Sequence, residues 1–370
     1  MLNLHKVFTS SVKIASIEVL KFQGNLFVRS TSKDGATGIV MANGRLRHCL
    51  SLLEVLIIPY FRGKDARDLE SLVEGVYIHN SNYKNSGVPF WNCVAHVEMS
   101  LLDMLGHMAG KPVGALLGDV IRTEIPVYIS SFAREKTADE TVKGLHEMLD
   151  QTGAKAFKLK IGGRMSKNAD SLPGRTEALI PMARKSLGDK IEIYVDANGS
   201  YDSVKAIEVG RMLEAHDYGF FEEPCPWEDF VETKQVADAL AITVAGGEQD
   251  TSMPKFDWMI HNRGVDLIQP DLMYNGGFIR CMQVARMAAS AGMQITPHSP
   301  TIGPTAAPKI QFASVVPNFG PYQEHRAANK SETWYSPSFE AKNGVIEVPI
   351  GPGLGVSYDQ QVWSKAEKLL

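Results

Sequence analysis

The chain has 370 residues, of which 44% are hydrophobic and 22% are charged, and its formal net charge is -4. This length predicts about two domains, one of which has room for a barrel of roughly 250 residues. The composition is that of a soluble globular protein rather than a disordered or membrane-embedded one. The negative net charge argues against a nucleic-acid partner, so we expect small solutes as partners.

The cysteines are scattered along the chain, with no close pair that would indicate a disulfide framework or a cysteine-based zinc site. They are Cys49, Cys93, Cys225 and Cys281. The first 20 residues lack the apolar run of a signal peptide, and no stretch has the length of a transmembrane helix. We therefore expect a cytoplasmic protein that does not bind membranes.

The N-terminal part reads as short extended segments followed by helices. The segments VKIASIEVL, NLFVRST and TGIVMA predict an antiparallel meander between Val12 and Met41. Helices are predicted around Arg45–Ile58, Asp65–His79 and Trp91–Met108. Strands that precede helices in this way indicate an α+β unit, to which we assign residues 1–124.

Beyond residue 124 short apolar strands alternate with amphipathic helices. The predicted strands are Pro126–Ser130, Ala156–Ile161, Ile191–Val195, Gly219–Glu222, Ile242–Gly246, Val265–Gln269, Gln294–Pro297 and Asn318–Gln323. A Thr137 to Glu140 capping box begins the first intervening helix, and Gly153 ends it. Eight such strands predict an α/β fold with a closed parallel barrel over residues 125–325. A doubly wound open sheet is the rival, although no G-x-G-x-x-G motif opens a helix.

Two segments lie outside this repeat. The C-terminal residues 326–370 are irregular and strand-rich, and they are too short to fold alone, so we expect them to pack on the N-terminal unit. The connection 162–174 is longer than is usual between a strand and a helix, which indicates a cover over a site. Its Arg164 and Lys167 either attract an anionic substrate or are solvated loop charges.

Polar residues follow the predicted strands at their C-terminal ends, the rim where α/β barrels build active sites. Three are acids on neighbouring strands: Asp196 in YVDANG, Glu222 in FFEEP and Glu248 in AGGEQD. Singly each could be a helix N-cap or a surface charge, but three together would repel one another unless a cation neutralises them. Oxygen ligands completed by water and substrate favour Mg²⁺.

Candidate bases occur on strands at either side of these acids. Lys158 and Lys160 in FKLKIGG are two apart, so on a strand their ammonium groups share one face and each disfavours protonation of the other. One of them could act as a neutral base near pH 7, although paired lysines are also common on solvated edges. Asp271 in IQPDL and His298 in TPHSP fall on adjoining strands, where the carboxylate fixes the imidazole tautomer. Lys160 and His298 are expected to approach a metal-held substrate from opposite faces.

A carboxylate substrate placed between these bases would lose its α-proton and become an enediolate, whose charge a divalent ion stabilises. Glu324 follows the last predicted strand and leaves two alternatives open. If protonated, it hydrogen-bonds the substrate oxygen away from the metal; otherwise it forms an ion pair with Arg326.

With these motifs the chain resembles the enolase superfamily, in its mandelate racemase-type subgroup, whose acid-sugar dehydratases it is similar to. The resemblance extends to SLLDMLGHMAGKPVGALLGD, which is similar to the family's linker between capping domain and barrel, and to PGLGV near the C-terminus. It implies a modified TIM barrel, (β/α)₇β, with an α+β cap that the C-terminal tail completes. It also implies a homo-oligomer and the combination of a Lys or His base with Mg²⁺ that is known for this superfamily.

The resemblance further implies a role for each matching residue. Lys160 is similar to the lysine base, Lys158 to the neighbour that lowers its pKa, and His298 with Asp271 to the base-and-acid dyad. Asp196, Glu222 and Glu248 are similar to the metal ligands, Asn198 to a substrate-contacting amide, and Glu324 to the electrophilic glutamate. Loops of the cap around Phe22–Asn25 and Lys33–Gly38 are where the family selects its substrate.

The same resemblance favours dehydration of a sugar acid to a 2-keto-3-deoxy acid, in which His298 protonates the leaving β-hydroxyl. If the imidazolium instead returns a proton to the α-carbon, the enzyme is a racemase or epimerase, and a cycloisomerase belongs to the same alternative. A barrel that only binds a sugar acid is a third hypothesis. Loss of chemistry normally removes a ligand or a base, and none is missing here.

Overall fold

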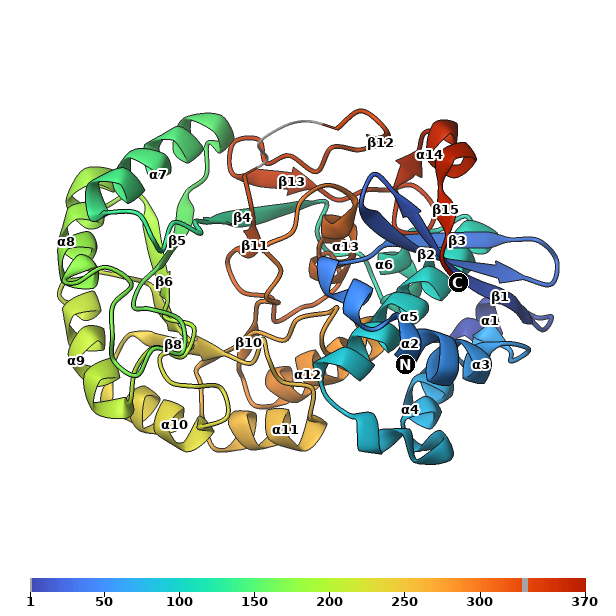
Figure 1. The fold of residues 1–370 in the computed structure, drawn as a ribbon, viewed down its shortest axis with the longest axis horizontal. Helices are drawn as coiled ribbons and strands as arrows, with labels where there is room; N and C mark the ends of the chain where they lie inside the picture. The colour runs from blue at the N-terminus through green and yellow to red at the C-terminus, as the bar shows by residue number, and fades with distance from the viewer. Residues whose placement is uncertain (1, 328–331) are drawn as a thin grey trace.

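The computed structural model describes residues 2–327 and 332–370. Figure 1 shows a barrel encircled by helices on the left and a small antiparallel sheet with its own helices on the right. The small sheet has the order β15-β1-β2-β3. Its strands are β1 (Ile14–Phe22), β2 (Asn25–Ser32), β3 (Thr37–Met41) and β15 (Glu367–Lys368). The predicted meander is thus confirmed, and a strand from the C-terminus extends it.

Short helical segments flank this sheet. They are α1 (Leu4–Val7), η1 (Gly44–His48), α2 (Leu50–Leu52), η2 (Leu53–Ile57), α3 (Ile58–Phe61), η3 (Ala66–Asp68), α4 (Leu69–Ile78), η4 (His79–Asn85) and α6 (Val113–Leu117). The stretch predicted to be helical around Arg45–Ile58 is helical, but it is divided into 3₁₀, α and π turns. Pro59 follows the π turn, and a proline has no N–H for the regular helical bond.

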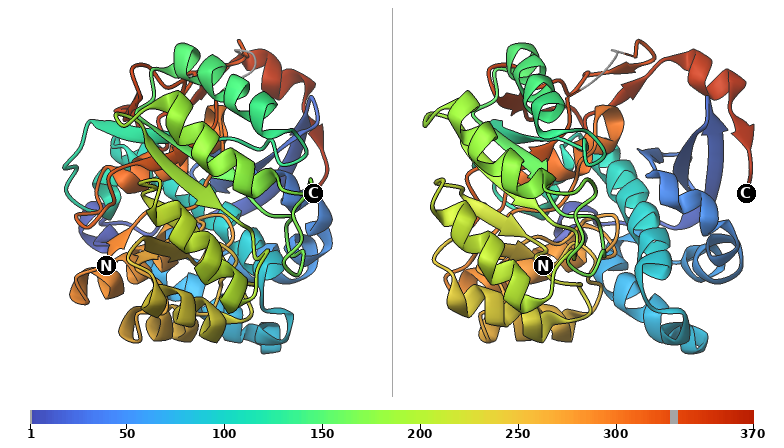
Figure 2. Two further views of the ribbon diagram at one scale, coloured as in Figure 1. Left: turned by 90° about the vertical axis from the view of Figure 1, so that its left-hand side faces the viewer. Right: turned by 60° about the vertical axis from the view of Figure 1, so that its left-hand side comes forward.

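The long helix α5 (Val88–Ala109) lies between the small sheet and the barrel, as Figure 2 shows in its right-hand view. It is buried on nearly all sides, which is typical of a helix enclosed by two layers. Gly110 ends it with a φ of 63°, the left-handed conformation that glycine adopts at helix ends.

Eight parallel strands form the barrel in the order β10-β9-β8-β7-β6-β5-β4-β11. They are β4 (Glu124–Ser130), β5 (Ala156–Lys160), β6 (Glu192–Asp196), β7 (Phe220–Glu222), β8 (Thr243–Gly246), β9 (Leu267–Ile268), β10 (Gln294–Ile295) and β11 (Gln323–His325). The ring closes where Ile295 is hydrogen-bonded to Asn318 and Gly320. The predicted barrel is therefore confirmed, and the open doubly wound sheet is wrong.

The last strand begins later than predicted. The stretch Asn318–Gln323 contributes only the two closing bonds to β10, and the extended strand β11 is shifted toward the C-terminus. Pro321 interrupts the predicted range, and its missing N–H prevents a regular ladder there.

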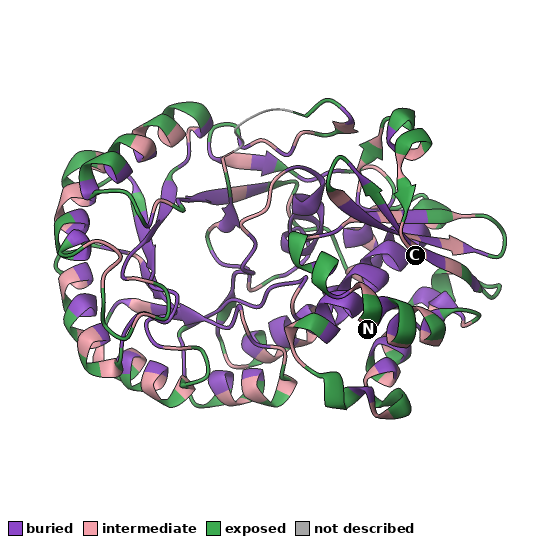
Figure 3. Cartoon of the chain, viewed as in Figure 1, coloured by how far each residue is buried: buried purple, intermediate pink, exposed green. Residues whose placement is uncertain are grey.

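Helices surround the barrel, and all but the last two helical segments expose their outer faces, while the strands are buried (Figure 3). They are α7 (Ala138–Thr152), α8 (Arg175–Leu187), α9 (Ser203–Glu214), α10 (Phe230–Ala239), α11 (Met253–His261), α12 (Phe278–Ser290), η5 (Gly303–Ala306) and α13 (Ala307–Ala313). The predicted capping box of Thr137 and Glu140 begins α7, and Gly153 ends it.

Side chains of alternate strand residues divide the barrel into an aromatic floor and a polar rim. Tyr194 and Phe220 stack inside it with their ring centroids 3.9 Å apart, and Tyr128 packs edge-on against both. The intervening residues, such as Phe157 and Leu159, point outward into the main hydrophobic core. This floor fills the barrel below the rim, so the polar residues meet at one end only.

The C-terminal segment contacts both parts of the molecule. Its elements are β12 (Tyr335–Ser336), β13 (Val345–Glu347), β14 (Ser357–Tyr358), α14 (Gln360–Lys365) and β15. Strand β13 pairs with β4 of the barrel, whereas β15 pairs with β1. The segment thus contacts the N-terminal unit, on which we expect it to pack, and it also contacts the barrel. Residues 328–331 of the proposed segment 326–370 lie outside the described part, and the boundaries at 124 and 325 stay a prediction.

The four cysteines are buried and free of disulfide bonds. Among the described residues, none of the helices combines the length and the hydropathy that a membrane span would need.

Candidate active site

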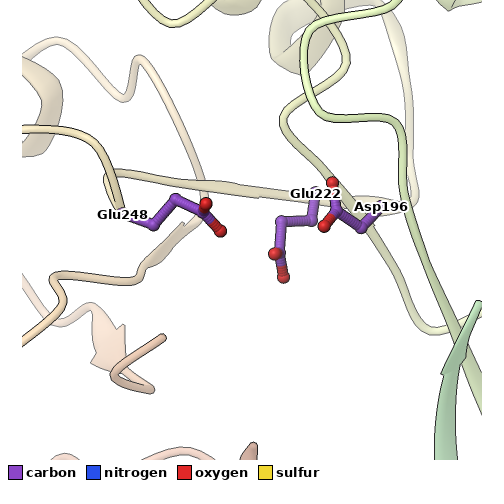
Figure 4. Close-up of side chains that lie close together, drawn as sticks. All are labelled: Asp196, Glu222 and Glu248. Carbon is purple, nitrogen blue, oxygen red and sulfur yellow. The ribbon is translucent and has the colours of Figure 1, made fainter. Parts of the chain in front are cut away.

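Three carboxylates converge at the C-terminal ends of neighbouring barrel strands. Asp196 ends β6 and lies in register with Glu222, which ends β7, while Glu248 follows β8. Each offers an oxygen within 4.8 Å of the others, and Figure 4 shows the carboxylates directed toward a shared space. Asp196 and Glu222 are 0% exposed and Glu248 is 5% exposed. The structure thus brings the three predicted acids together.

Their hydrogen bonds leave part of their acceptor capacity unused. Asp196 accepts from the backbone N–H of Asn198 at 2.7 Å, and Glu222 accepts from the amide of Gln269 at 2.8 Å. One oxygen of Glu248 accepts from Gln249 at 2.7 Å. The other, Oε2, is buried and makes no hydrogen bond, although His298 Nε2 lies 3.3 Å from it. A bound cation would give this oxygen a direct ligand contact.

The acids are not fully neutralised by the bases around them. Burial raises the pKa of Glu222 to about 8, because repulsion from neighbouring carboxylates adds to it and the attraction of Lys158 only partly offsets both. Burial, together with repulsion from Glu248, raises the pKa of the adjacent Glu223 as well. Asp196 differs, since Lys160 and Lys158 overcome its burial and lower its pKa to about 2. The excess of negative charge and the all-oxygen donor set fit a hard divalent cation.

Lys158 and Lys160 both point into the barrel, as their spacing predicts, but each ammonium has its own carboxylate partner. Lys160 Nζ is bonded to Asp196. Lys158 Nζ lies 2.6 and 2.7 Å from the two oxygens of Glu222 and 2.9 Å from Glu324 Oε1. Burial would lower the pKa of Lys158, but these two glutamates raise it well above its usual value. Lys158 therefore favours its charged form, and the expectation that Lys160 is the base of the pair stays a prediction.

His298 and Asp271 form the predicted dyad. Asp271 Oδ2 lies 2.8 Å from His298 Nδ1, and its Oδ1 accepts from the backbone N–H of Met273 at 2.7 Å. The other imidazole nitrogen, Nε2, is 3.3 Å from Glu248 Oε2. Burial would lower the pKa of the imidazole, but Glu248, Glu324 and Asp271 raise it to about 10. His298 is thus protonated at neutral pH and held beside the carboxylate centre.

Glu324 has partners other than the predicted one. It is paired with Lys158 instead of Arg326, and it also accepts from the hydroxyl of Ser130 and from the backbone N–H of Ser299 at 2.8 Å. Arg326 lies over the ring of Phe132, at 5.0 Å from its centroid. Burial would raise the pKa of Glu324, but Lys158 and His298 lower it below its usual range. The predicted ion pair with Arg326 is therefore wrong, because the counter-ion of Glu324 is Lys158, and a hydrogen bond from Glu324 to the substrate stays a prediction.

Asn198 lies on the rim, where two guanidinium groups share its amide oxygen. Arg134 donates to Asn198 Oδ1 at 2.7 Å and Arg164 donates at 3.2 Å, while the amide nitrogen donates to Asp196 at 3.0 Å. Its place beside a carboxylate of the centre is compatible with the substrate contact that the resemblance implies. That contact stays a prediction.

The long connection 162–174 packs on the turn after β6. The backbone N–H groups of Met165 and Asn168 donate to the carbonyls of Asn198 and Ser200 at 3.0 and 2.8 Å. Gly162 has a φ of 58°, and a Cβ there would lie 2.5 Å from the side chain of Ser200, so only glycine fits. The connection therefore lies beside the acid centre, with Arg164 as its direct link to the rim. That it covers the site stays a prediction.

Several rim residues escaped the sequence reasoning. They are Ser130, Arg134, Glu223, Gln269, Tyr274 and Lys309. Ser130 ends β4, and Gln269 directly follows β9, so the rule that selected the acids would have found them if applied to every polar residue. Arg45 of η1 had no such signal, because it is distant in the sequence. Its Nε donates to the hydroxyl of Tyr274 at 2.8 Å, and the Tyr274 ring lies 6.1 Å from that of His298.

The site can now be set beside known proteins. Residues 140–362 match the family model described as enolase C-terminal domain-like, which is more than half of the chain. The chain belongs to this family. The resemblance to the enolase superfamily and its mandelate racemase-type members is thereby confirmed. An arabinonate dehydratase of Saccharolobus solfataricus is 27% identical over 85% of this chain and 82% of its own length.

Solved structures of the superfamily match nearly the whole chain. A protein from Roseobacter denitrificans is 34% identical, with a TM-score of 0.90 over 96% of this chain and 98% of its own. A mandelate racemase/muconate lactonizing protein from Paracoccus denitrificans complexed with magnesium is 27% identical, with a TM-score of 0.89 over 97% of this chain and 99% of its own. The predicted combination of cap and barrel is therefore an arrangement found in this superfamily.

Proposed function

We propose that the protein is a Mg²⁺-dependent acid-sugar dehydratase that removes the α-proton of a sugar acid and forms a 2-keto-3-deoxy acid. The observation that carries this proposal is the convergence of Asp196, Glu222 and Glu248 within 4.8 Å. Lys160 is bonded to the first of these acids, and His298 lies beside the last. Bound Mg²⁺ would polarise the substrate carboxylate and stabilise the charge that develops on it.

The side chains at the two ends of the carboxylate trio supply the proton transfers. Lys160 would remove the α-proton, because it stands at the end of β5 beside Asp196 and so faces a substrate held at the carboxylate trio. His298, whose pKa is raised to about 10, carries a proton at neutral pH. It would donate that proton to the β-hydroxyl as this group leaves. Asp271 holds the imidazole through Nδ1 and leaves Nε2 free to face the substrate.

The racemase, epimerase or cycloisomerase alternative uses the same residues. It requires only that His298 protonate the α-carbon instead of a leaving hydroxyl. Dehydration is favoured by the similarity to an arabinonate dehydratase. The alternative has support from the racemase and lactonizing protein whose fold the chain shares. A barrel that merely binds a sugar acid has no support of this kind, because the three acids and both candidate bases are all present.

The reaction can be tested by incubating the protein and Mg²⁺ with a set of aldonic and aldaric acids and measuring 2-keto acid. Arabinonate belongs in the set. Appearance of a 2-keto-3-deoxy acid is the expected result. If solvent deuterium enters the α-position in D₂O and no keto acid forms, the enzyme is an isomerase. If no acid in the set reacts or exchanges, the proposal of an enzyme in this class is refuted.

The roles of the bases are tested by Lys160→Met and His298→Asn, with Mg²⁺ affinity measured in parallel. Each variant should retain the metal and lose turnover by at least about 100-fold, the contribution typical of a general acid or base. Lys205→Met is a matched control, because Lys205 lies on α9 and forms surface ion pairs with Glu177 and Glu208. Unchanged turnover in both site variants would reject the mechanism. A homo-oligomeric state and a cytoplasmic location remain predictions.

A further inference from the structure

The barrel wall is incomplete at the rim between β10 and β11. Near the floor, the N–H of Ile295 donates to Asn318 at 3.0 Å and its carbonyl accepts from Gly320 at 2.9 Å. Among the described residues, the backbone bonds between these strands end there. Pro297 and Pro300 flank His298 and Ser299, and neither proline has an N–H to continue a ladder. The segment that carries His298 therefore lacks backbone support on its β11 side, whereas a parallel bridge joins His298 to Asp271 on its β9 side.

Side chains replace the missing ladder. Gln323 Nε2 donates to the carbonyl of Pro297 at 2.7 Å, and the N–H of Ser299 donates to Glu324 Oε2 at 2.8 Å. Lys309, from α13 behind the wall, donates to three carbonyls. They are those of Ser299 at 2.6 Å, Thr301 at 3.0 Å and Glu324 at 2.7 Å.

The geometry of Lys309 matches an ammonium group whose donors are all in use. An ammonium has three N–H donors, and the three carbonyls account for all of them. The side chain is 1% exposed. Burying a charge is unfavourable unless hydrogen bonds compensate for it, so the position of Lys309 requires these carbonyls, and the carbonyls are fixed in turn. One of these carbonyls belongs to Ser299, the residue directly after His298, and another belongs to Glu324.

We propose that Lys309 is a positioning residue for the His298 side of the site. It ties the segment after His298 to the backbone of Glu324, and so fixes the imidazole relative to Glu324 and the carboxylate centre. None of these three hydrogen bonds of Lys309 reaches Lys160, which lies in the continuous ladder between β5 and β6. This inference rests on the proposed function, because it assigns His298 and Lys160 to opposite faces of the substrate.

The experiment compares proton exchange on the two faces in Lys309→Met and Lys309→Gln. Arabinonate and its 2-epimer ribonate present their α-protons to opposite faces, so deuterium incorporation with Mg²⁺ in D₂O, followed upward in pH until the His298 imidazole loses its proton, reports each base separately. Methionine removes every donor, and we expect a loss of about 10- to 100-fold on the His298 face, as misplacement of a reacting group by about 1 Å produces. Exchange on the Lys160 face should change less than about threefold by the same reasoning. Glutamine retains two donors, so the exchange rate of Lys309→Gln on the His298 face should lie between those of the wild type and Lys309→Met.

Gln311→Met is the matched control. Gln311 lies on the same helix and is equally buried, but its amide bonds join Gly114 and Pro349 at 2.9 and 2.8 Å. Its loss should lower stability without altering the ratio of exchange on the two faces. If Lys309→Met slows both faces equally, or if Gln311→Met shifts the ratio as much, the inference is overturned.

A second measurement needs no substrate. The ¹⁵N signals of the His298 imidazole, assigned by their absence in His298→Asn, should move in Lys309→Gln and not in Gln311→Met. Unchanged signals in Lys309→Gln would overturn the inference. A wild-type protein that exchanges neither α-proton would refute the proposed function alone, because the imidazole signals would still decide whether Lys309 positions His298.

Discussion

From β5 to β8 the strands are joined by backbone ladders that extend to the rim, whereas β9 and β10 are short and the backbone bonding between β10 and β11 ends below the rim, where side chains join the two segments. The first half carries Lys160 and two of the acids at the ends of paired strands, with Lys160, Asp196 and Glu222 in register. The second half has two-residue strands at β9 and β10. There His298 is held by Asp271, and its neighbour Ser299 by Lys309.

This difference separates two tasks. The metal-binding half needs fixed ligand positions, and a regular ladder provides them. The half with the dyad carries the His298 imidazole, whose proton must move during the reaction. Side-chain hydrogen bonds fix the position of this imidazole where the sheet is not continuous. We therefore expect substitutions in the first half to act on charge and metal binding, and those in the second half to act on placement.

The largest effect is expected from Glu222→Gln, which removes a charge from the centre of the regular half. Under the proposed function the variant should lose most of its Mg²⁺ affinity and at least about 1,000-fold in turnover, since the metal contributes several kcal/mol to the transition state. Titration calorimetry and the keto-acid assay measure the two effects. Glu208→Gln is the control, because Glu208 is exposed on α9. Full activity and full Mg²⁺ affinity in Glu222→Gln would mean that the carboxylate trio is not the metal site.

Lys158→Met should produce the next largest effect, this time on stability. Its ammonium bridges Glu222 and Glu324, and all three side chains are at most 1% exposed. Removing one partner of a buried ion pair leaves an uncompensated charge, which typically lowers the free energy of unfolding by about 3–5 kcal/mol. Urea unfolding of Lys158→Met and of the wild type measures this loss in the free energy of unfolding.

Lys205→Met provides the comparison for Lys158→Met, because Lys205 forms its ion pairs on the surface. Surface pairs of this kind contribute about 0–1 kcal/mol. If Lys158→Met unfolds at the same urea concentration as Lys205→Met, the bridge between the two halves of the rim carries no stability, and the charge-based account of the regular half fails.

A pH-dependent effect is expected from Glu98 on α5, which anchors the second half. Its oxygens accept from the N–H groups of Phe278 and Ile279 at 3.0 and 2.8 Å, at the start of the helix that follows the Asp271 loop. Burial raises its pKa to about 8, although these two bonds oppose the rise. The native state therefore keeps a proton that the unfolded chain loses near its ordinary value of 4.5.

Because the native state binds more protons in this window, stability should fall as the pH rises from about 4.5 to about 8, by at most about 1.4 kcal/mol per pH unit. Glu98→Gln has no proton to lose at this position, so its unfolding free energy should vary less with pH. Urea midpoints measured between pH 5 and pH 8 give both slopes. Equal slopes in the two proteins would show that Glu98 is not a protonated anchor.

The two halves also differ in how far the sequence predicts them. The spacing of Lys158 and Lys160 predicts that both side chains share one face of their strand. The predicted ends of the parallel strands place the carboxylates on one rim. The position of Glu324 and the role of Lys309 were out of reach. Both depend on which groups meet across the barrel.

The same limit explains the errors in the elements themselves. Pro321 delays β11, and the stretch predicted to be helical around Arg45–Ile58 contains a π turn just before Pro59. Apolar periodicity continues through both prolines, but the missing N–H alters the backbone bonding locally. Strand order and the capping box were predicted because they depend on short segments. The partner of Glu324 was not predicted, because Arg326 is its neighbour in the sequence whereas Lys158 becomes its neighbour only in the fold.

The smallest effect is expected from Thr137→Ala, which tests whether the regular half is locally determined. Thr137 and Glu140 satisfy each other's backbone N–H groups at the start of α7, at 2.9 and 3.3 Å. Loss of a capping hydroxyl typically lowers the free energy of unfolding by about 1 kcal/mol. Thermal unfolding measures this loss. The variant should keep the wild-type exchange ratio on the two substrate faces, because α7 joins two strands whose register is set by their own ladder. A changed ratio would mean that the regular half also depends on its surrounding helices, and the contrast with the Lys309 side would no longer hold.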